Sequence, residues 1–224
     1  MNIYERAHKD LSLSIYSKAS QELKSWELDL NPPKDQYILR MPILTPEYDR
    51  FLIPSELEWI YPSLNRALYG QSQLHVGAVY IYVTVRSGLV RSVDDDVWHV
   101  DGFSMRTPHR PEQNYIWSDM YGTEFLPQNF DIPADFDPMR HNLHTFIQDR
   151  ASVAPVTLTT GRLYQIDPYH VHRRPTVPEG TQRTFLRISF VPVEIEDDTC
   201  MPNPLAPRRA PYNRNDIRKT LIRY

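Results

Sequence analysis

His99 and Asp101, in the segment VWHVDGF, are the residues whose types and spacing most directly suggest metal chemistry. Residues two positions apart on a strand point to the same face, so this imidazole and carboxylate would converge on one point. The segment DPYHVHRRP offers a third ligand, either His170 or His172, which are also two positions apart. Two histidines and one carboxylate leave coordination positions open, as non-haem Fe(II) oxygenases require, whereas a structural zinc site fills four positions.

A second polar pair, Arg187 and Ser189, lies inside the apolar segment TFLRISF. Strand alternation places both on one face, with apolar neighbours on the other. A guanidinium inside a sheet needs an anionic partner, and a ligand carboxylate can bind it through two parallel hydrogen bonds. The Ser189 hydroxyl would add another bond. Two plainer interpretations remain open: Arg187 could pair with a protein acid such as Glu194, and His99 and Asp101 could be only a hydrogen-bonded pair at a strand end.

The order of these motifs resembles that of the 2-oxoglutarate-dependent Fe(II) oxygenases. His-x-Asp comes first, a distal histidine followed by arginine comes next at His172 and Arg173, and Arg-x-Ser lies near the end. The Arg-x-Ser motif is similar to that of the isopenicillin N synthase-like branch. The resemblance covers residues 74–193, about half of the chain. The interval from His172 to Arg187 is longer than is usual in that branch, and the chain is short for it.

This resemblance implies a set of site residues and cofactors. His99, Asp101 and His172 would be the catalytic ligands of Fe(II), with His172 preferred to His170 because a His-Arg pair precedes the Arg-x-Ser strand. Arg187, together with Ser189, would hold the far carboxylate of 2-oxoglutarate, and O₂ would be the second co-substrate. The expected reaction is hydroxylation, or another oxidation, of a C–H bond in a small-molecule or amino-acid-type substrate.

The elements that must position these residues read as mainly β with flanking helices. The family fold is a double-stranded β-helix, also called a jelly roll or cupin-like fold. Short segments rich in Val, Ile and Tyr between proline-bearing connections are typical of such an architecture. Candidate strands cover residues 75–85, 97–100, 114–118, 156–160, 163–166 and 184–191.

We expect three regions along the chain. Residues 1–73 would form a helical flank packed on the core, with one helix over 11–27 and two short helices, or one kinked at Pro62, between Ser55 and Gly70. Residues 74–193 would form the catalytic core, and residues 194–224 a wrapping tail. A short helix from Asp137 or Pro138 to Gln148 would interrupt the core.

Tyr115 and Trp117 share one face of the candidate strand over 114–118. We expect this pair to line the pocket beside the metal ligands and to contact the co-substrate. A purely structural aromatic core is the alternative interpretation of the same two residues.

Composition narrows the functional class further. The net charge of −3 and the lack of a long run of one sign do not indicate a nucleic-acid partner, and no stretch is long and apolar enough to span a membrane. One cysteine excludes an intramolecular disulfide, and the polar start is not a secretory signal, so we expect a cytoplasmic protein with a small-molecule substrate. The oligomeric state is not readable from the sequence.

Two other functions remain open. One is a cupin-like metal enzyme that uses no 2-oxoglutarate, such as an oxidative cyclase, dioxygenase or isomerase, with His170 as an additional ligand. The other is a non-enzymatic jelly-roll binding module in which the same polar residues make structural hydrogen bonds.

Overall fold

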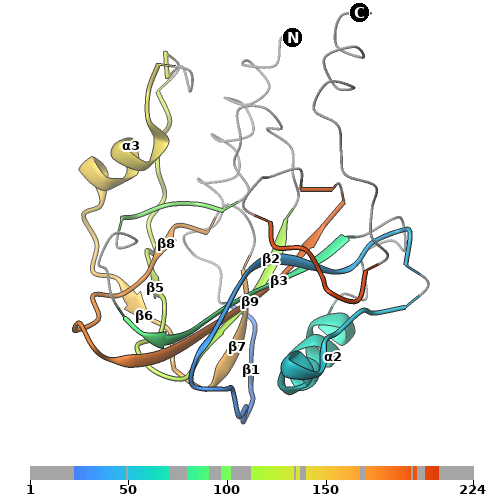
Figure 1. Cartoon of the computed structure of the whole chain (residues 1–224). Coiled ribbons are helices and arrows are strands. Elements are labelled where there is room, and N and C mark those ends of the chain that lie inside the picture. Colours follow the sequence, from blue (N-terminus) through green and yellow to red (C-terminus); the bar gives the residue numbers. More distant parts are fainter. Residues whose placement is uncertain are drawn as a thin grey trace, which may run out of the picture.

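Antiparallel strands dominate the computed structural model, and they form two sheets (Figure 1). The structure describes residues 23–48, 50–70, 80–90, 97–101, 112–133, 135–136, 140–166, 170–192, 194–195 and 200–206. The described strands are β1 (Ser25–Glu27), β2 (Gln36–Leu44), β3 (Tyr80–Leu89), β4 (Gln113–Ser118), β5 (Glu124–Phe125), β6 (Val156–Thr157), β7 (Arg162–Ile166), β8 (His172–Arg173) and β9 (Gln182–Val191). The described helices are η1 (Ser55–Ile60), α2 (Tyr61–Gly70) and α3 (Leu143–Arg150).

The strand order is that of a jelly roll. The large sheet runs β1-β7-β4-β9-β3-β2, and the small sheet runs β6-β5-β8. An isolated bridge between His99 and His172 adds the segment around His99 to the β8 side of the small sheet. From β3 onward the chain passes repeatedly between the two sheets. On the large sheet it forms β3, β4, β7 and β9, and on the small-sheet side it forms β5, β6, β8 and the bridged segment around His99. Two opposed sets of four segments are typical of a jelly roll. The expected fold class, mainly β with a double-stranded β-helix core, is therefore confirmed.

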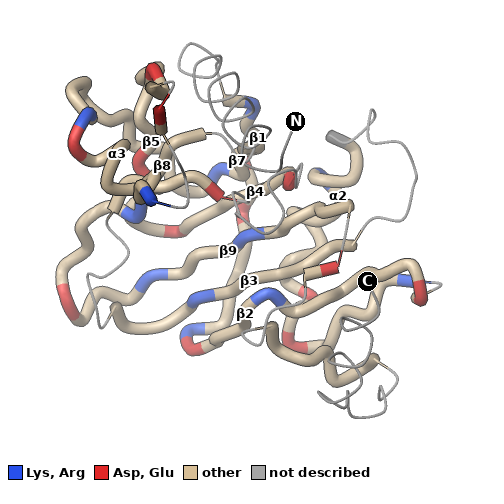
Figure 2. The backbone as a smooth tube through the Cα atoms, turned by 90° about the horizontal axis from the view of Figure 1, so that it is seen from above, with Lys and Arg blue, Asp and Glu red and all other residues tan. Residues whose placement is uncertain are grey.

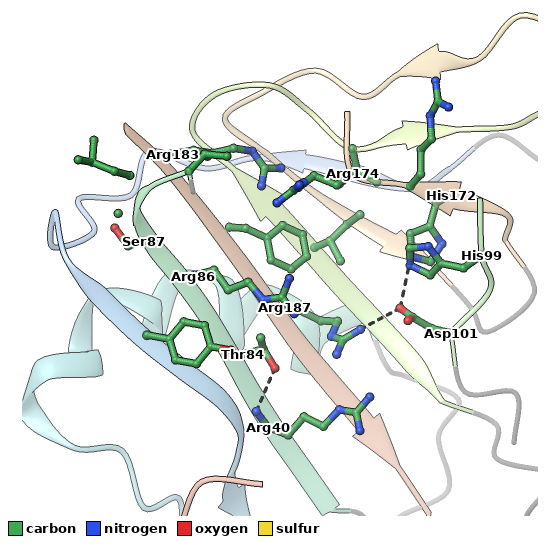
Figure 3. Close-up of a pocket in the computed structure, with 18 of the residues that line it drawn as sticks. Arg40, Thr84, Arg86, Ser87, His99, Asp101, His172, Arg174, Arg183 and Arg187 are labelled. Atoms are coloured by element: carbon green, nitrogen blue, oxygen red, sulfur yellow. Dashed lines mark hydrogen bonds and ion pairs between the residues drawn. The ribbon is translucent and has the colours of Figure 1, made fainter. Parts of the chain in front are cut away.

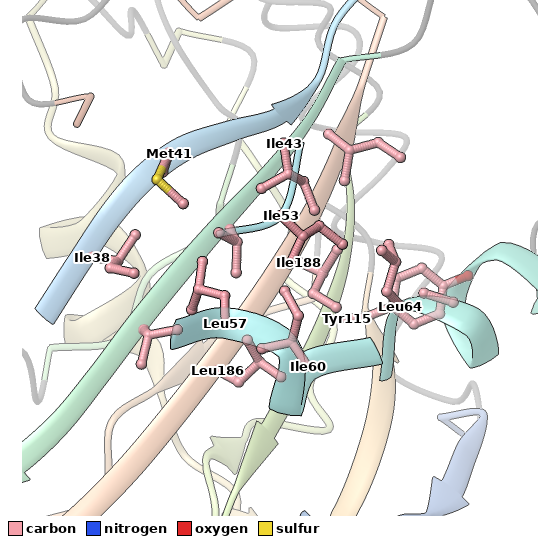
Figure 4. Close-up of a cluster of buried hydrophobic side chains, with 14 of the residues drawn as sticks. Ile38, Met41, Ile43, Ile53, Leu57, Ile60, Leu64, Tyr115, Leu186 and Ile188 are labelled. Atoms are coloured by element: carbon pink, nitrogen blue, oxygen red, sulfur yellow. The ribbon is translucent and has the colours of Figure 1, made fainter. Parts of the chain in front are cut away.

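The molecule is layered, and each layer is held by its own apolar cluster. Leu57, Ile60 and Leu64 of η1 and α2 pack on one face of the large sheet, against residues such as Leu186 and Ile188 (Figure 4). Burial of side chains of this size stabilises the fold by about 1.5–3 kcal/mol each.

The opposite face of the large sheet packs against the small sheet. Ile116 of β4 and Ile166 of β7 contact Phe125 of β5 in a second cluster. A third cluster joins α3 to the segment around Trp98. The two sheets therefore enclose the space into which inward-facing polar residues project.

The N-terminal region differs from the expected helical flank. Residues 11–22 of the predicted helix lie outside the described residues, but Ser25–Glu27 form β1 on the edge of the large sheet, where Trp26 pairs with Leu163. Gln36–Leu44 form β2, which pairs with β3. The helical pattern was misleading here because pairing with the sheet edge, a tertiary interaction, overrides local periodicity.

The two short helices expected between Ser55 and Gly70 are present as η1 and α2. Pro62 falls in the first turn of α2, where the missing N–H is tolerated. The helix expected over residues 137–148 begins later, at Leu143, because the Asn142 side chain caps it by accepting hydrogen bonds from the amides of His144 and Thr145.

The end of the described chain lies against β2. The amide of Met201 donates to the carbonyl of Leu39, and Asn203 Nδ2 donates to the carbonyls of Pro42 and Leu52. Residues 207–224 of the predicted tail lie outside the described residues. A membrane-spanning helix is not found in the part of the chain that the structure describes.

Candidate metal centre

His99, Asp101 and His172 lie together at one end of the space between the sheets (Figure 3). Each offers one ligand atom, and these atoms all lie within 4.8 Å of one another. The backbone explains the convergence, because the amide of His99 donates to the carbonyl of His172 at 3.0 Å and the reverse bond is 2.9 Å. This mutual pairing sets the two imidazoles side by side, with ring centroids 4.5 Å apart.

Both histidines are oriented in the same way. Nδ1 of His99 lies 2.8 Å from the carbonyl of Val97, and Nδ1 of His172 lies 2.7 Å from the carbonyl of His170. A carbonyl can only accept, so each Nδ1 carries a proton. Nε2 is therefore the atom that presents a lone pair whenever the ring is neutral. Fixing the second ring nitrogen in this manner is what metal-binding histidines usually require.

Asp101 is held in place through one of its two oxygens. Oδ2 accepts hydrogen bonds from Arg187 Nη1 at 3.0 Å and from Asn114 Nδ2 at 3.3 Å, and it lies 3.5 Å from His172 Nε2. Among the described residues, Oδ1 accepts no hydrogen bond. One carboxylate oxygen is thus anchored, and the other is available to a metal ion.

The protonation states suit a metal site. Burial first, and then the neighbouring His172, lower the pKa of His99 to about 4, so this ring is neutral at pH 7. Burial alone would raise the pKa of Asp101, but Arg187 and the two histidines hold it well below its usual range. Burial opposes the charge on His172 as well, yet Asp101 outweighs it and raises the pKa of His172.

Arg187 projects from β9 toward this group. Its cross-strand neighbours are Thr84 on β3 and Ile116 on β4. Burial disfavours the guanidinium charge, but Asp101 and then Glu112 raise its pKa, so it stays charged. Its Nε is buried and has no hydrogen-bond partner among the described residues. A buried donor without a partner is costly, and an anionic ligand would remove that cost.

Ser189 has a different partner from the one expected. Its hydroxyl donates to Asn114 Oδ1 at 2.5 Å, and Asn114 donates in turn to Asp101. Ser189 therefore positions the Asp101 carboxylate through Asn114, and its hydrogen is not directed at the cavity.

The expectation that Tyr115 and Trp117 line the pocket is wrong. Both are buried in the core on the α2 side of the large sheet, and Trp117 Nε1 donates to the carbonyl of Leu28. Alternation along β4 turns Asn114 and Ile116 toward the site instead. The sequence did contain a signal for this orientation: Asn114 is a polar residue within an apolar strand, and its face is the one that points to the site.

His170 is not part of the group that could hold a metal among the described residues. It is buried beside Phe125, with ring centroids 5.5 Å apart, and its carbonyl orients His172. His144 of α3 lies beside His99, with ring centroids 6.0 Å apart.

A cavity of about 700 Å³ opens from the three candidate ligands across the inner face of the large sheet. Beside Arg187, further arginines line it among the described residues: Arg40, Arg86, Arg173, Arg174 and Arg183. Sequence reasoning missed them. Arg183 had a readable signal, because it is four residues before Arg187 on the same strand and therefore shares its face.

No family model matches the sequence, and no curated protein matches it. Several solved structures show partial similarity, and three of them are described here. EvdMO1 has 18% identity over 85% of this chain and 44% of its own, at a TM-score of 0.39, and AviO1 from Streptomyces viridochromogenes Tue57 has 15% identity over 90% of this chain and 86% of its own, at 0.38. The Escherichia coli ribosomal oxygenase YcfD has 13% identity over 71% of this chain and 41% of its own, at 0.23.

This chain therefore spans less than half of the length of EvdMO1. The fold assignment rests on the strand order, and the site rests on its own geometry.

Proposed function

We propose that this chain is a non-haem Fe(II) oxygenase that uses 2-oxoglutarate to oxidise a C–H bond of a small molecule. The observation that carries the proposal is the convergence of His99, Asp101 and His172, with both Nε2 atoms presented inward. Two neutral imidazoles and one carboxylate are the donor set of non-haem Fe(II) oxygenases. The described residues offer this group no fourth ligand of the kind that a structural zinc site needs.

Fe(II) held there would supply O₂ activation coupled to oxidative decarboxylation of 2-oxoglutarate. The protein's own part is positioning. Arg187 and Asn114 fix one oxygen of Asp101, and backbone carbonyls fix both imidazoles. Metal binding would displace any proton on His172 Nε2, which Asp101 stabilises in the metal-free protein.

The co-substrate proposal rests on Arg187. Its charge, its place beside the three candidate ligands and its buried Nε without a partner fit a carboxylate of 2-oxoglutarate. The remaining cavity could hold a substrate of ordinary metabolite size, and hydroxylation is the reaction we expect.

Anaerobic titration of the protein with Fe(II) and 2-oxoglutarate tests the proposal. We expect the visible metal-to-ligand charge-transfer band in the parent, and its loss in Asp101→Ala and His172→Ala. His170→Ala is the matched control and should keep the band, because this ring is not among the candidate ligands. Fe(II) binding without the band would favour a cupin-like metal enzyme that uses no keto acid. A parent that binds no metal would favour a binding module.

The variant Arg187→Gln tests whether this arginine binds 2-oxoglutarate directly or only supports the metal ligand Asp101. The loss of a charge-assisted hydrogen bond, about 1.5–3 kcal/mol, should weaken 2-oxoglutarate binding at least about tenfold. Fe(II) affinity, measured by anaerobic calorimetry without 2-oxoglutarate, should also fall by about tenfold, because Arg187 is one of the two hydrogen-bond donors to Asp101. The affinity for 2-oxoglutarate is therefore measured at saturating Fe(II). Arg66→Gln, on α2 at the far side of the large sheet, is the charge-matched control. An unchanged 2-oxoglutarate affinity at saturating Fe(II) would show that Arg187 serves only to hold Asp101.

A further inference from the structure

A second hydroxyl group lies beside Arg187, on the neighbouring strand of the large sheet. Thr84 of β3 is the cross-strand partner of Arg187 of β9, and Figure 2 shows these two strands side by side. Residues directly opposite one another in an antiparallel pair point to the same face, with Cβ atoms about 5 Å apart. Thr84 is 3% exposed and lines the same cavity as Arg187. A ligand group that binds Arg187 from the cavity would therefore lie within reach of the Thr84 hydroxyl.

A bulge in β2 orients this hydroxyl. The β2 register shifts between Ile38 and Met41, so two residues oppose the single position of Thr84. One of them, Arg40, has a left-handed φ of 45°, which is costly for a residue other than glycine. Its amide donates to Thr84 Oγ1 at 3.1 Å (Figure 3). Bulges are common beside active sites, where they redirect a side chain, and this one fixes the Thr84 oxygen from the β2 side.

The hydroxyl hydrogen of Thr84 has no acceptor in the part of the chain that the structure describes. A threonine hydroxyl can donate one hydrogen bond besides those that it accepts, and the only bond of Thr84 Oγ1 there is the one from the Arg40 amide. Arg187 Nε is likewise buried without a partner. Two buried donors that lack acceptors are costly. A carboxylate that reaches both would satisfy them together, because it only accepts hydrogen bonds and has two oxygens.

Ser189, the hydroxyl residue expected in this role from the Arg-x-Ser motif, is committed elsewhere. Alternation places it on the same face of β9 as Arg187, two residues further along. Its hydroxyl donates to Asn114 Oδ1, and it is not among the described residues that line the cavity. The hydrogen that a ligand carboxylate could accept is therefore available from Thr84 and not from Ser189.

On the basis of the proposed function, we propose that Thr84 takes the role expected of Ser189 and, together with Arg187, binds the far carboxylate of 2-oxoglutarate. Arg187 supplies its charge and Nε–H, and Thr84 supplies O–H from the adjacent strand. Arg187 Nη1 keeps its bond to Asp101, because the two contacts use different nitrogen atoms of one guanidinium. The hydroxyl of Thr84 would thereby favour a keto acid that carries a second carboxylate.

Anaerobic calorimetry with 2-oxoglutarate at saturating Fe(II) tests the role of Thr84. Thr84→Val keeps the shape of the side chain and removes the hydroxyl, so it should weaken 2-oxoglutarate binding by about tenfold or more. Thr84→Ser keeps a hydroxyl and should stay within about threefold of the parent. Fe(II) affinity without keto acid should stay within about twofold in both variants, because no hydrogen bond joins Thr84 to the candidate ligands.

Thr45→Val is the matched control. Thr45 is 4% exposed, and its Oγ1 also accepts one backbone amide, that of Glu47, but it does not line the cavity. This variant loses the same groups as Thr84→Val and should keep the parent affinity for 2-oxoglutarate within about twofold. Circular dichroism would verify that each variant is folded. Equal losses of affinity in the two valine variants would overturn the inference, and so would full affinity in Thr84→Val.

A second keto acid tests the contact with the far carboxylate in the parent itself. 2-Oxopentanoate has the same chain length as 2-oxoglutarate but ends in a methyl group. We expect the parent to bind 2-oxoglutarate at least about tenfold more tightly, and Thr84→Val to narrow this preference. Equal affinities of the parent for the two keto acids would overturn the inference even if Thr84→Val did not fold.

Calorimetry separates the failure of this inference from that of the oxygenase proposal, because it measures keto-acid binding whether or not the charge-transfer band appears. Binding of 2-oxoglutarate that depends on Thr84 but gives no band would sink only the oxygenase. A band in the parent, with full 2-oxoglutarate affinity in Thr84→Val, would sink only the role of Thr84. A parent that binds no 2-oxoglutarate would overturn both.

Discussion

At the scale of single residues, the two histidines of the candidate centre are oriented alike but differ in electrostatics. Each donates Nδ1–H to a carbonyl two residues earlier, so the strand itself fixes the direction of the ring. His99 is kept neutral, whereas the carboxylate of Asp101 favours a proton on His172. The three side chains therefore behave as one coupled unit, and a change in any of them should affect the other two.

Asn114 provides a residue-scale prediction. Its amide links Ser189 to Asp101, so Asn114→Ala removes one of the two hydrogen bonds that hold the Asp101 carboxylate. Loss of such an outer partner should weaken Fe(II) binding by about tenfold, as measured by anaerobic calorimetry. Asn142→Ala removes the cap of α3 and should cost about 1 kcal/mol of stability without changing metal affinity. Unchanged Fe(II) affinity in Asn114→Ala would show that Arg187 alone suffices.

At the scale of elements, alternation along the strands separates core from site. On β9, Leu186 and Ile188 enter the apolar core while Arg187 faces the cavity. On β2, a bulge between Ile38 and Met41 interrupts this alternation. Arg40 at the bulge has a left-handed φ of 45°, its amide donates to Thr84 Oγ1, and the residue lines the cavity. A strained backbone is thus maintained where it adds a positive charge to the cavity wall.

Gly122, between β4 and β5, provides an element-scale prediction. A Cβ atom there would lie 1.7 Å from the carbonyl oxygen of Leu158, so Gly122→Ala must displace backbone. We expect a loss of about 3 kcal/mol or more in the free energy of unfolding. Gly161→Ala is the matched control, because its Cβ would meet nothing within 4 Å and its φ of +72° costs only about 1–2 kcal/mol. Similar losses measured by urea unfolding would contradict the steric argument.

At the scale of the whole molecule, the candidate site depends on both sheets. His99 and His172 come from the small-sheet side, whereas Arg187 and Asn114 come from the large sheet. The end of the described chain returns to the large sheet as well, where the amide of Ile195 donates to the Tyr82 hydroxyl. Segments far apart in sequence therefore fix the space in which a substrate would bind.

Tyr82 makes the stability of the whole molecule depend on pH. Burial raises its pKa from 10 to about 12, although the Ile195 hydrogen bond partly opposes this change. As the pH rises, the Tyr82 hydroxyl ionises at a lower pH in the unfolded chain than in the folded protein. Its contribution to the free energy of unfolding is therefore complete below pH 10 and is lost as the pH rises toward 12, by about 3 kcal/mol. In Tyr82→Phe, urea unfolding between pH 9 and 11 should show a shallower decline than in the parent. Parallel declines would mean that Tyr82 ionises normally in the folded protein.

The sequence predicted more of the fold than of the pocket. The strands predicted over 114–118, 163–166 and 184–191 are present, because the local β preference of their residues agrees with their pairing in the sheet. The flank was misjudged at β1 and β2, where pairing with distant strands decides the conformation. Tyr115 and Trp117 were assigned to the wrong face, because alternation shows which residues share a face but not which face is inward.

By itself, the sequence predicted the mainly β class, His99 and Asp101 as candidate ligands, and the face that Arg187 shares with Ser189, since each depends on residue type and a two-residue period. Only the tertiary structure decided that His172 rather than His170 joins His99 and Asp101, because the backbone bridge between the two strands sets their register. It alone also revealed the arginine-lined cavity. Its charges come from strands and loops that are distant in sequence and meet only when the two sheets close on each other.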